Sequence, residues 1–262
     1  MTYTETDLVA TMERLAGADL AALTQQQRDW LDQFHAGGPE AVDRLLPGLR
    51  LAAGSTVLDI GSGLGGPARQ IARSTGATVV GVDITPAYVE AAQELTDAAG
   101  LAERVRFFCS DIAGYDQDGF DAGYTMHVQM NVEDKKAFFA GIAHRLRPGA
   151  PFATFEVCLG AGGRPAPPLP WSLDGSDSFL IAADELRDTI RAAGFEPVEW
   201  VDETEWVRQW FEDLGKRLAS GEARATLPAL LADGPMRMLN YAVAVSEGTV
   251  TVHRGLFLRT AA

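Results

Sequence analysis

Three aspartates lie next to apolar runs in the first half of the chain, where their side chains could hold a ligand. Asp59 lies two residues before a glycine-rich segment, Asp83 ends the next apolar run, and Asp111 follows the third. The carboxyl ends of parallel strands meet at one edge of a sheet, so the three carboxylates should lie near one another. They can accept hydrogen bonds from hydroxyl and amino groups and can face a positive charge. We therefore expect them to bind a cationic nucleoside without phosphates.

The segment between Asp59 and Asp83 predicts the unit that places these groups. Unbroken apolar runs over 56–60 and 78–83 predict buried parallel strands. Glycines follow the first run, and Pro67 after them can open a helix. The sequence therefore predicts a strand, a glycine turn, a helix and a second strand.

The same glycines are also compatible with a different cofactor, a nicotinamide dinucleotide. Gly61, Gly63 and Gly66 match the dinucleotide pattern G-x-G-x-x-G, and Asp83 is placed to bind a ribose. A nicotinamide-dependent oxidoreductase is therefore an alternative from spacing alone. Asp59 argues against it, because its carboxylate would repel a pyrophosphate at the helix N-terminus.

The motif Asp59-Ile60-Gly61-Ser62-Gly63-Leu64-Gly65, followed by Asp83 and by Ser110-Asp111-Ile112, resembles that of the class I S-adenosylmethionine-dependent methyltransferases. The likeness covers roughly residues 30 to 260, as a domain of this size allows. It implies an α/β fold with a Rossmann-like seven-stranded sheet, helices on both faces and an antiparallel last strand. S-adenosylmethionine is the implied cofactor, and the implied cofactor-binding residues are Asp59, Gly61, Gly63, Gly65, Asp83, Ile84, Asp111, Ile112 and Met126.

Three further segments resemble a small-molecule subgroup, near the glycine/sarcosine and quinone-biosynthesis methyltransferases. They are Phe34 to Gly38, Met126 to Asn131, and Leu169-Pro170-Trp171. The resemblance implies that the first segment, with His35 and Gly38, folds over the cofactor. A purely structural role for this loop is the alternative.

The segment after the predicted fourth strand, 120–126, should meet the substrate. His127 is the candidate general base, or else a group that only orients the acceptor, since its ordinary pKa lies near neutrality. Gln129 and Met130 are candidate substrate contacts, and Asn131 is interpreted as a helix cap. Trp171 is expected to wall the pocket. Glu156 could line the pocket or pair structurally.

Composition narrows the class of protein. The net charge of −14 argues against a nucleic-acid substrate. No apolar run is long enough to cross a membrane, and residues 1–10 do not resemble a signal peptide, so we expect a cytoplasmic protein. Cys109 and Cys158 are interpreted as free core thiols, and no metal site is expected. A small-molecule substrate is the expected partner, with a homodimer as the candidate assembly.

The chain is interpreted as a single domain, 1–262. A helical cover over 1–54, packed on the sheet, is followed by the cofactor-binding core over 55–158. A lid loop rich in glycine and proline follows over 159–180, then a helical substrate cap over 205–241 and a last strand over 249–259.

The resemblance implies direct displacement of a methyl group onto N, O or C of the acceptor. A protein that binds S-adenosylmethionine without transferring methyl, such as a cyclase of secondary metabolism, is the alternative.

Overall fold

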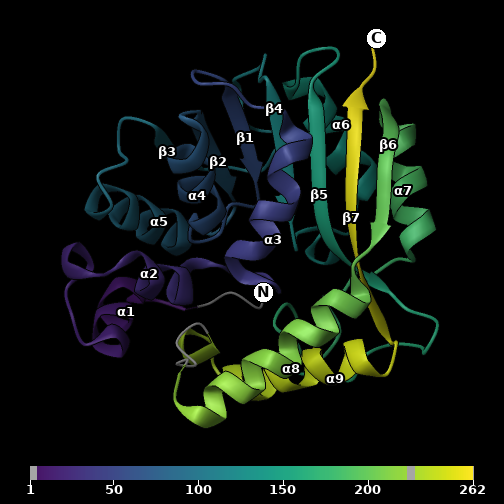
Figure 1. The fold of residues 1–262 in the computed structure, drawn as a ribbon. Coiled ribbons are helices and arrows are strands. Elements are labelled where there is room, and N and C mark those ends of the chain that lie inside the picture. Colours follow the sequence, from purple (N-terminus) through teal and green to yellow (C-terminus); the bar gives the residue numbers. More distant parts are fainter. Residues whose placement is uncertain (1–4, 223–227, 262) are drawn as a thin grey trace.

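A seven-stranded mixed sheet forms the centre of the computed structural model, which describes residues 5–222 and 228–261 (Figure 1). The strand order is β3-β2-β1-β4-β5-β7-β6, and β7 runs antiparallel to both of its neighbours. The predicted class of fold is therefore confirmed. The strands are β1 (Thr56–Ile60), β2 (Thr78–Asp83), β3 (Val105–Cys109), β4 (Ala122–Met126), β5 (Pro151–Leu159), β6 (Phe195–Asp202) and β7 (Val250–Arg259).

Helices cover both faces of the sheet because side chains of the central strands are buried on both sides. Val57 of β1 belongs to the same core cluster as Ile71, whereas Leu58, which points to the opposite face, clusters with Ile142. The first face carries α3 (Gly38–Leu45), α4 (Gly66–Thr75) and part of α5 (Pro86–Ala98), and the second carries α6 (Lys135–Arg145) and α7 (Ala183–Ala192).

The remaining helices lie beyond the carboxyl ends of the parallel strands. They are α1 (Leu8–Ala16), α2 (Gln25–Asp32), α8 (Thr204–Ser220) and α9 (Gly234–Ser246) (Figure 1). Leu8 and Met12 of α1 cluster with Leu95 of α5 and with Leu230, which precedes α9. The expectation that α1 packs on the sheet is therefore wrong, because its apolar face is buried against α5 and the cap segment instead.

Two local expectations are also wrong. Cys109 is exposed, because β3 is an edge strand of the sheet, while Cys158 in β5 is buried. Asn131 does not cap α6. A 3-10 turn over Gln129–Asn131 comes first, and Asp134 caps the helix by accepting a hydrogen bond from the Ala137 N–H at 3.0 Å.

Candidate functional site

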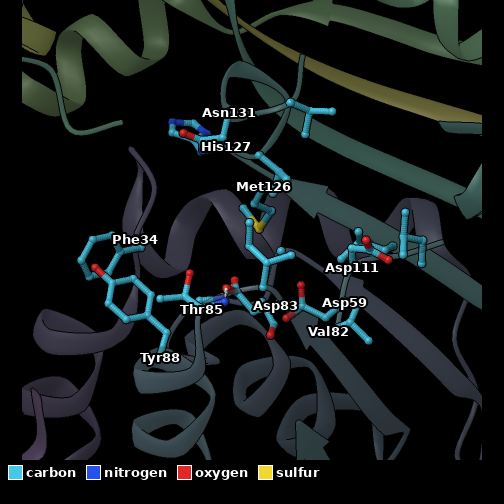
Figure 2. A pocket seen from close by; sticks show the side chains of 18 of the residues that line it. Phe34, Asp59, Val82, Asp83, Thr85, Tyr88, Asp111, Met126, His127 and Asn131 are labelled. Atoms are coloured by element: carbon cyan, nitrogen blue, oxygen red, sulfur yellow. Dashed lines mark hydrogen bonds between the residues drawn. The ribbon is translucent and has the colours of Figure 1, made fainter. Parts of the chain in front are cut away.

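A cavity of about 590 Å³ opens at the carboxyl ends of β1, β2 and β4, and residues after β3 complete that wall (Figure 2). This volume lies within the ordinary range of small-molecule sites. The cavity brings together most of the predicted residues: Asp59, Gly61, Gly63, Asp83, Ile84, Asp111, Ile112, Met126, His127, His35 and Trp171.

The backbone conformation of the turn after β1 requires glycine. Gly61 and Gly63 have φ values of +74° and +51°, and a Cβ on Gly61 would lie 2.5 Å from the Val128 Cγ2 atom. Gly65 is the N-cap of α4 at φ +74° and does not line the cavity, although its Cβ would collide with the Phe107 ring at 2.3 Å. Gly65 therefore shapes the turn and takes no place in the cavity wall.

Asp83 fastens the turn to the start of α5. One carboxylate oxygen accepts from the Gly63 N–H at 2.9 Å, and the other accepts from the Thr85 N–H at 2.9 Å. Burial raises the pKa of this carboxyl group. Each oxygen has a further lone pair, so Asp83 can hold the turn and still accept a hydrogen bond from a ligand in the cavity.

Asp59 is buried beside Asp83 and near the Tyr124 hydroxyl, and neither that hydroxyl nor the Asp59 Oδ2 atom makes a hydrogen bond of ordinary geometry among the described residues. Burial, together with the nearby Asp83 charge, raises its pKa to about 7. A buried carboxylate oxygen without a partner fits a cationic ligand group, which would supply the missing interaction.

The adjacent wall offers both an apolar and a polar surface. Ile84 is 65% exposed although it is apolar, and it lines the cavity. Asp111 accepts a hydrogen bond from the Gly114 N–H at 2.6 Å, which orients its carboxylate at the same edge. A nucleoside base could therefore pack on Ile84 and donate a hydrogen bond to Asp111, and the residues present fit S-adenosylmethionine.

His127 takes a left-handed conformation, φ +57°, directly after β4. Its Nδ1 atom lies 3.1 Å from the Phe155 carbonyl oxygen, and its Nε2 atom lies 3.2 Å from the Ala36 amide nitrogen and 3.0 Å from the Tyr241 hydroxyl. Because an amide N–H only donates, Nε2 is the unprotonated nitrogen, and Nδ1–H donates to Phe155.

The imidazole of His127 is therefore neutral and both of its nitrogens have partners. Burial, with a smaller contribution from His35, lowers its pKa to about 3. A general-base role would require the partners of Nε2 to move away, so this geometry favours the orienting role over the base.

Two of the predicted substrate contacts lie outside the cavity wall. Gln129 is fully buried, and its amide donates to the Val157 carbonyl oxygen, while Met130 belongs to the core. Glu156 explains this loop, because its Oε2 accepts from the N–H groups of Val128 and Gln129 at 2.9 and 3.1 Å. Gly38 also stays outside the wall, as the first residue of α3.

The lid loop supplies Trp171 and Asp177 to the cavity wall, and α9 of the cap packs behind it. Trp171 is almost fully buried, its Nε1–H donates to the Ser178 hydroxyl at 2.9 Å, and its ring meets Tyr241 edge to face at 5.3 Å. Arg237 of α9 donates from Nε to the Leu169 carbonyl oxygen at 2.9 Å. The lid loop is therefore attached to α9.

Some residues that line the cavity were not predicted from the sequence. Tyr88 follows Asp83 in the first turn of α5, and this position at the same sheet edge is a signal that could have indicated it. Phe138 lies in α6, where an apolar residue at helical spacing is typical of the core and gives no sign of a ligand. Asp32 ends α2 and Asp177 lies in the lid loop, and neither segment has a sequence pattern that indicates a ligand-binding residue.

Residues 57–149 match the family described as "Methyltransferase domain". The chain is 32% identical to methyltransferase GfsG of Streptomyces halstedii over 49% of its own length, and this match spans only 47% of GfsG. It is 27% identical to O-methyltransferase resE of Aspergillus sclerotiorum, covering 76% of this chain and 78% of that protein. Among solved structures, it resembles the [4+2]-cyclase SpnF with a TM-score of 0.70 and 24% identity, covering 98% of this chain and 94% of that one.

Residues 57–149 thus carry a methyltransferase domain of the class I S-adenosylmethionine-dependent kind. S-adenosylmethionine is the cofactor of this class, and the match favours it over the nicotinamide alternative. No helix within residues 5–222 and 228–261 is long and apolar enough to span a membrane.

Proposed function

We propose that this protein transfers the methyl group of S-adenosylmethionine to N, O or C of a small-molecule acceptor. The observation that carries the proposal is the convergence of Asp59, Asp83 and Asp111 with the glycine turn in one cavity. Asp59 would face the positive end of the cofactor, Asp83 its ribose, and Asp111 with Ile84 its adenine. Gly61 and Gly63 leave room for its close approach.

The bound cofactor supplies a methyl group made electrophilic by its sulfonium. The chain itself has to orient the acceptor and exclude water, which gives rate through proximity. Phe34, Phe138 and Trp171 provide apolar walls for this, and His127 holds the end of β4 in place. Such a transfer needs no metal and no strong base once the acceptor atom has a lone pair.

A second candidate is a reaction that keeps S-adenosylmethionine bound without transferring its methyl group. The observation that favours it is that both ring nitrogens of His127 already have partners. Turnover without S-adenosylhomocysteine would identify this second reaction.

Calorimetric titration with S-adenosylmethionine, S-adenosylhomocysteine and NAD in parallel tests the proposal. We expect saturable binding of the two sulfur nucleosides and none of NAD. Asp83→Ala should weaken that binding by about 1–3 kcal/mol, since charge-assisted hydrogen bonds are lost. Glu103→Ala is the matched control, because Glu103 lies in an exposed turn just before β3, at the amino-terminal ends of the parallel strands. Binding of NAD alone would contradict the proposal.

We also propose that the protein acts as a homodimer in the cytoplasm. Light scattering coupled to gel filtration would check the mass, and a monomer would contradict the dimer.

A further inference from the structure

The cavity wall carries carboxylates and, among the described residues, no lysine or arginine. Burial lowers the pKa of His35 to about 4 and, together with the nearby His35, that of His127 to about 3, so neither imidazole brings a positive charge near neutral pH. The described lining is therefore acidic. Its carboxylates belong to Asp59, Asp83, Asp111 and Asp177, and to Asp32, whose charge is balanced by Arg69.

Basic side chains do occur in the surrounding walls, but they bind the protein itself. Arg69 is 1% exposed, and its Nη2 lies 2.8 Å from the Asp32 carboxylate. Lys135 donates from Nζ to the Val132 carbonyl oxygen at 2.6 Å. Arg237 is fully buried and donates to carbonyl oxygens of the lid loop. These three cations hold the cover, the loop after β4 and the lid, and none of them lines the cavity.

The half of the cavity beyond the cofactor carboxylates is largely apolar. Figure 2 shows Phe34 and His127 away from Asp59, with Met126 between His127 and Asp83. Other apolar side chains that line the cavity are Val128, Val132, Phe138 and Trp171.

We propose that the acceptor is an apolar molecule, uncharged or cationic, that carries no phosphate, sulfate or carboxylate group. This inference rests on the proposed function, because it assigns the far half of the cavity to the acceptor. An anionic group would leave water for a cavity with several carboxylates and, in the described part of the chain, no basic side chain to receive it. A neutral or cationic acceptor meets no such repulsion and can bury its apolar body against the aromatic walls.

Three probes with the same ring system test the charge preference: 1-naphthalenemethanol, 1-naphthalenemethylamine and 1-naphthoic acid. Each is titrated at pH 7.0 into protein saturated with S-adenosylhomocysteine, and binding is followed by calorimetry. We expect the alcohol and the amine to bind at least about ten-fold more tightly than the acid. Acid binding as tight as that of the alcohol would overturn the inference, and so would failure of both the alcohol and the amine to bind.

A variant adds a second readout. Asp177→Asn keeps the size of the side chain and removes one charge from the lining, so the preference for amine over acid should narrow by about three-fold or more. Glu103→Gln removes the same charge outside the cavity and should leave the preference unchanged. Equal effects of both variants would overturn the assignment to the cavity. S-adenosylhomocysteine is titrated first, so a failure of the proposed function is seen separately as absent cofactor binding.

Discussion

Affinity for S-adenosylmethionine should rise about sixteen-fold between pH 5.5 and pH 7.0, because Asp59 must be ionised to face a cation. In the ligand-free protein, burial and the Asp83 charge raise the Asp59 pKa to about 7. Below that pH the carboxyl group is mostly protonated and neutral. Binding of a cation favours the ionised form, so affinity grows as pH rises toward the free-protein pKa.

The magnitude follows from the ionised fraction of Asp59. With a pKa near 7, roughly 3% of the molecules carry the charge at pH 5.5 and roughly 50% at pH 7.0. The ratio is about sixteen, which corresponds to ~1.6 kcal/mol of binding free energy. The full difference appears when the bound cation lowers the Asp59 pKa to well below 5.5.

Calorimetry in buffers of different ionisation enthalpy measures both the affinity and the protons released. The wild-type protein should release close to one proton per cofactor at pH 5.5. Asp59→Asn should bind weakly at both pH values and lose most of the slope. A flat wild-type profile, or a slope that survives in Asp59→Asn, would refute the reasoning and assign the pH dependence to another carboxylate, such as Asp83.

Three further predictions concern the walls of the site. His127→Ala should slow turnover while the cofactor dissociation constant stays within about two-fold, as measured by steady-state kinetics and calorimetry; equal loss in both would place His127 in the cofactor site. Arg69→Met should lower the free energy of unfolding in urea by about 3–5 kcal/mol because Asp32 remains buried without its partner, and a change below about 1 kcal/mol would contradict this. Gly61→Ala should destabilise the protein by about 1–3 kcal/mol through its positive φ and its collision with Val128. Adding Val128→Ala should restore only part of that loss, and full recovery would show that φ strain is negligible.

The strands of the cofactor half could be predicted closely from the sequence. Thr56–Ile60 and Thr78–Asp83 have the predicted bounds, because each is a short, largely apolar run that ends at a polar or glycine residue. The carboxylates that matter follow directly from those ends. Local sequence therefore decides this half of the site.

The acceptor half could not be predicted in the same way, because tertiary contacts decide it. Gln129 was expected to contact the substrate from a binding loop. Its hydrogen bonds to the Val157 carbonyl oxygen and the Glu156 carboxylate hold it in the core instead. The exposure of Cys109 depends on the position of β3 in the sheet, which no local pattern gives. Asp177 lines the cavity from the lid loop, which Arg237 of α9 holds through the Leu169 and Pro170 carbonyl oxygens.

The position of β7 between β5 and β6 has a consequence for how the protein assembles during synthesis. β5 pairs with β4 as well as with β7, whereas β6 pairs with β7 over Phe195–Asp202, so one late segment joins β6 to the sheet. The first five strands are neighbours in the sheet and can pair while the chain is still being made, whereas β6 has no place in the sheet until Val250–Arg259 has emerged from the ribosome. A truncation inside that segment would therefore separate β6 from β5 and would not simply shorten an edge.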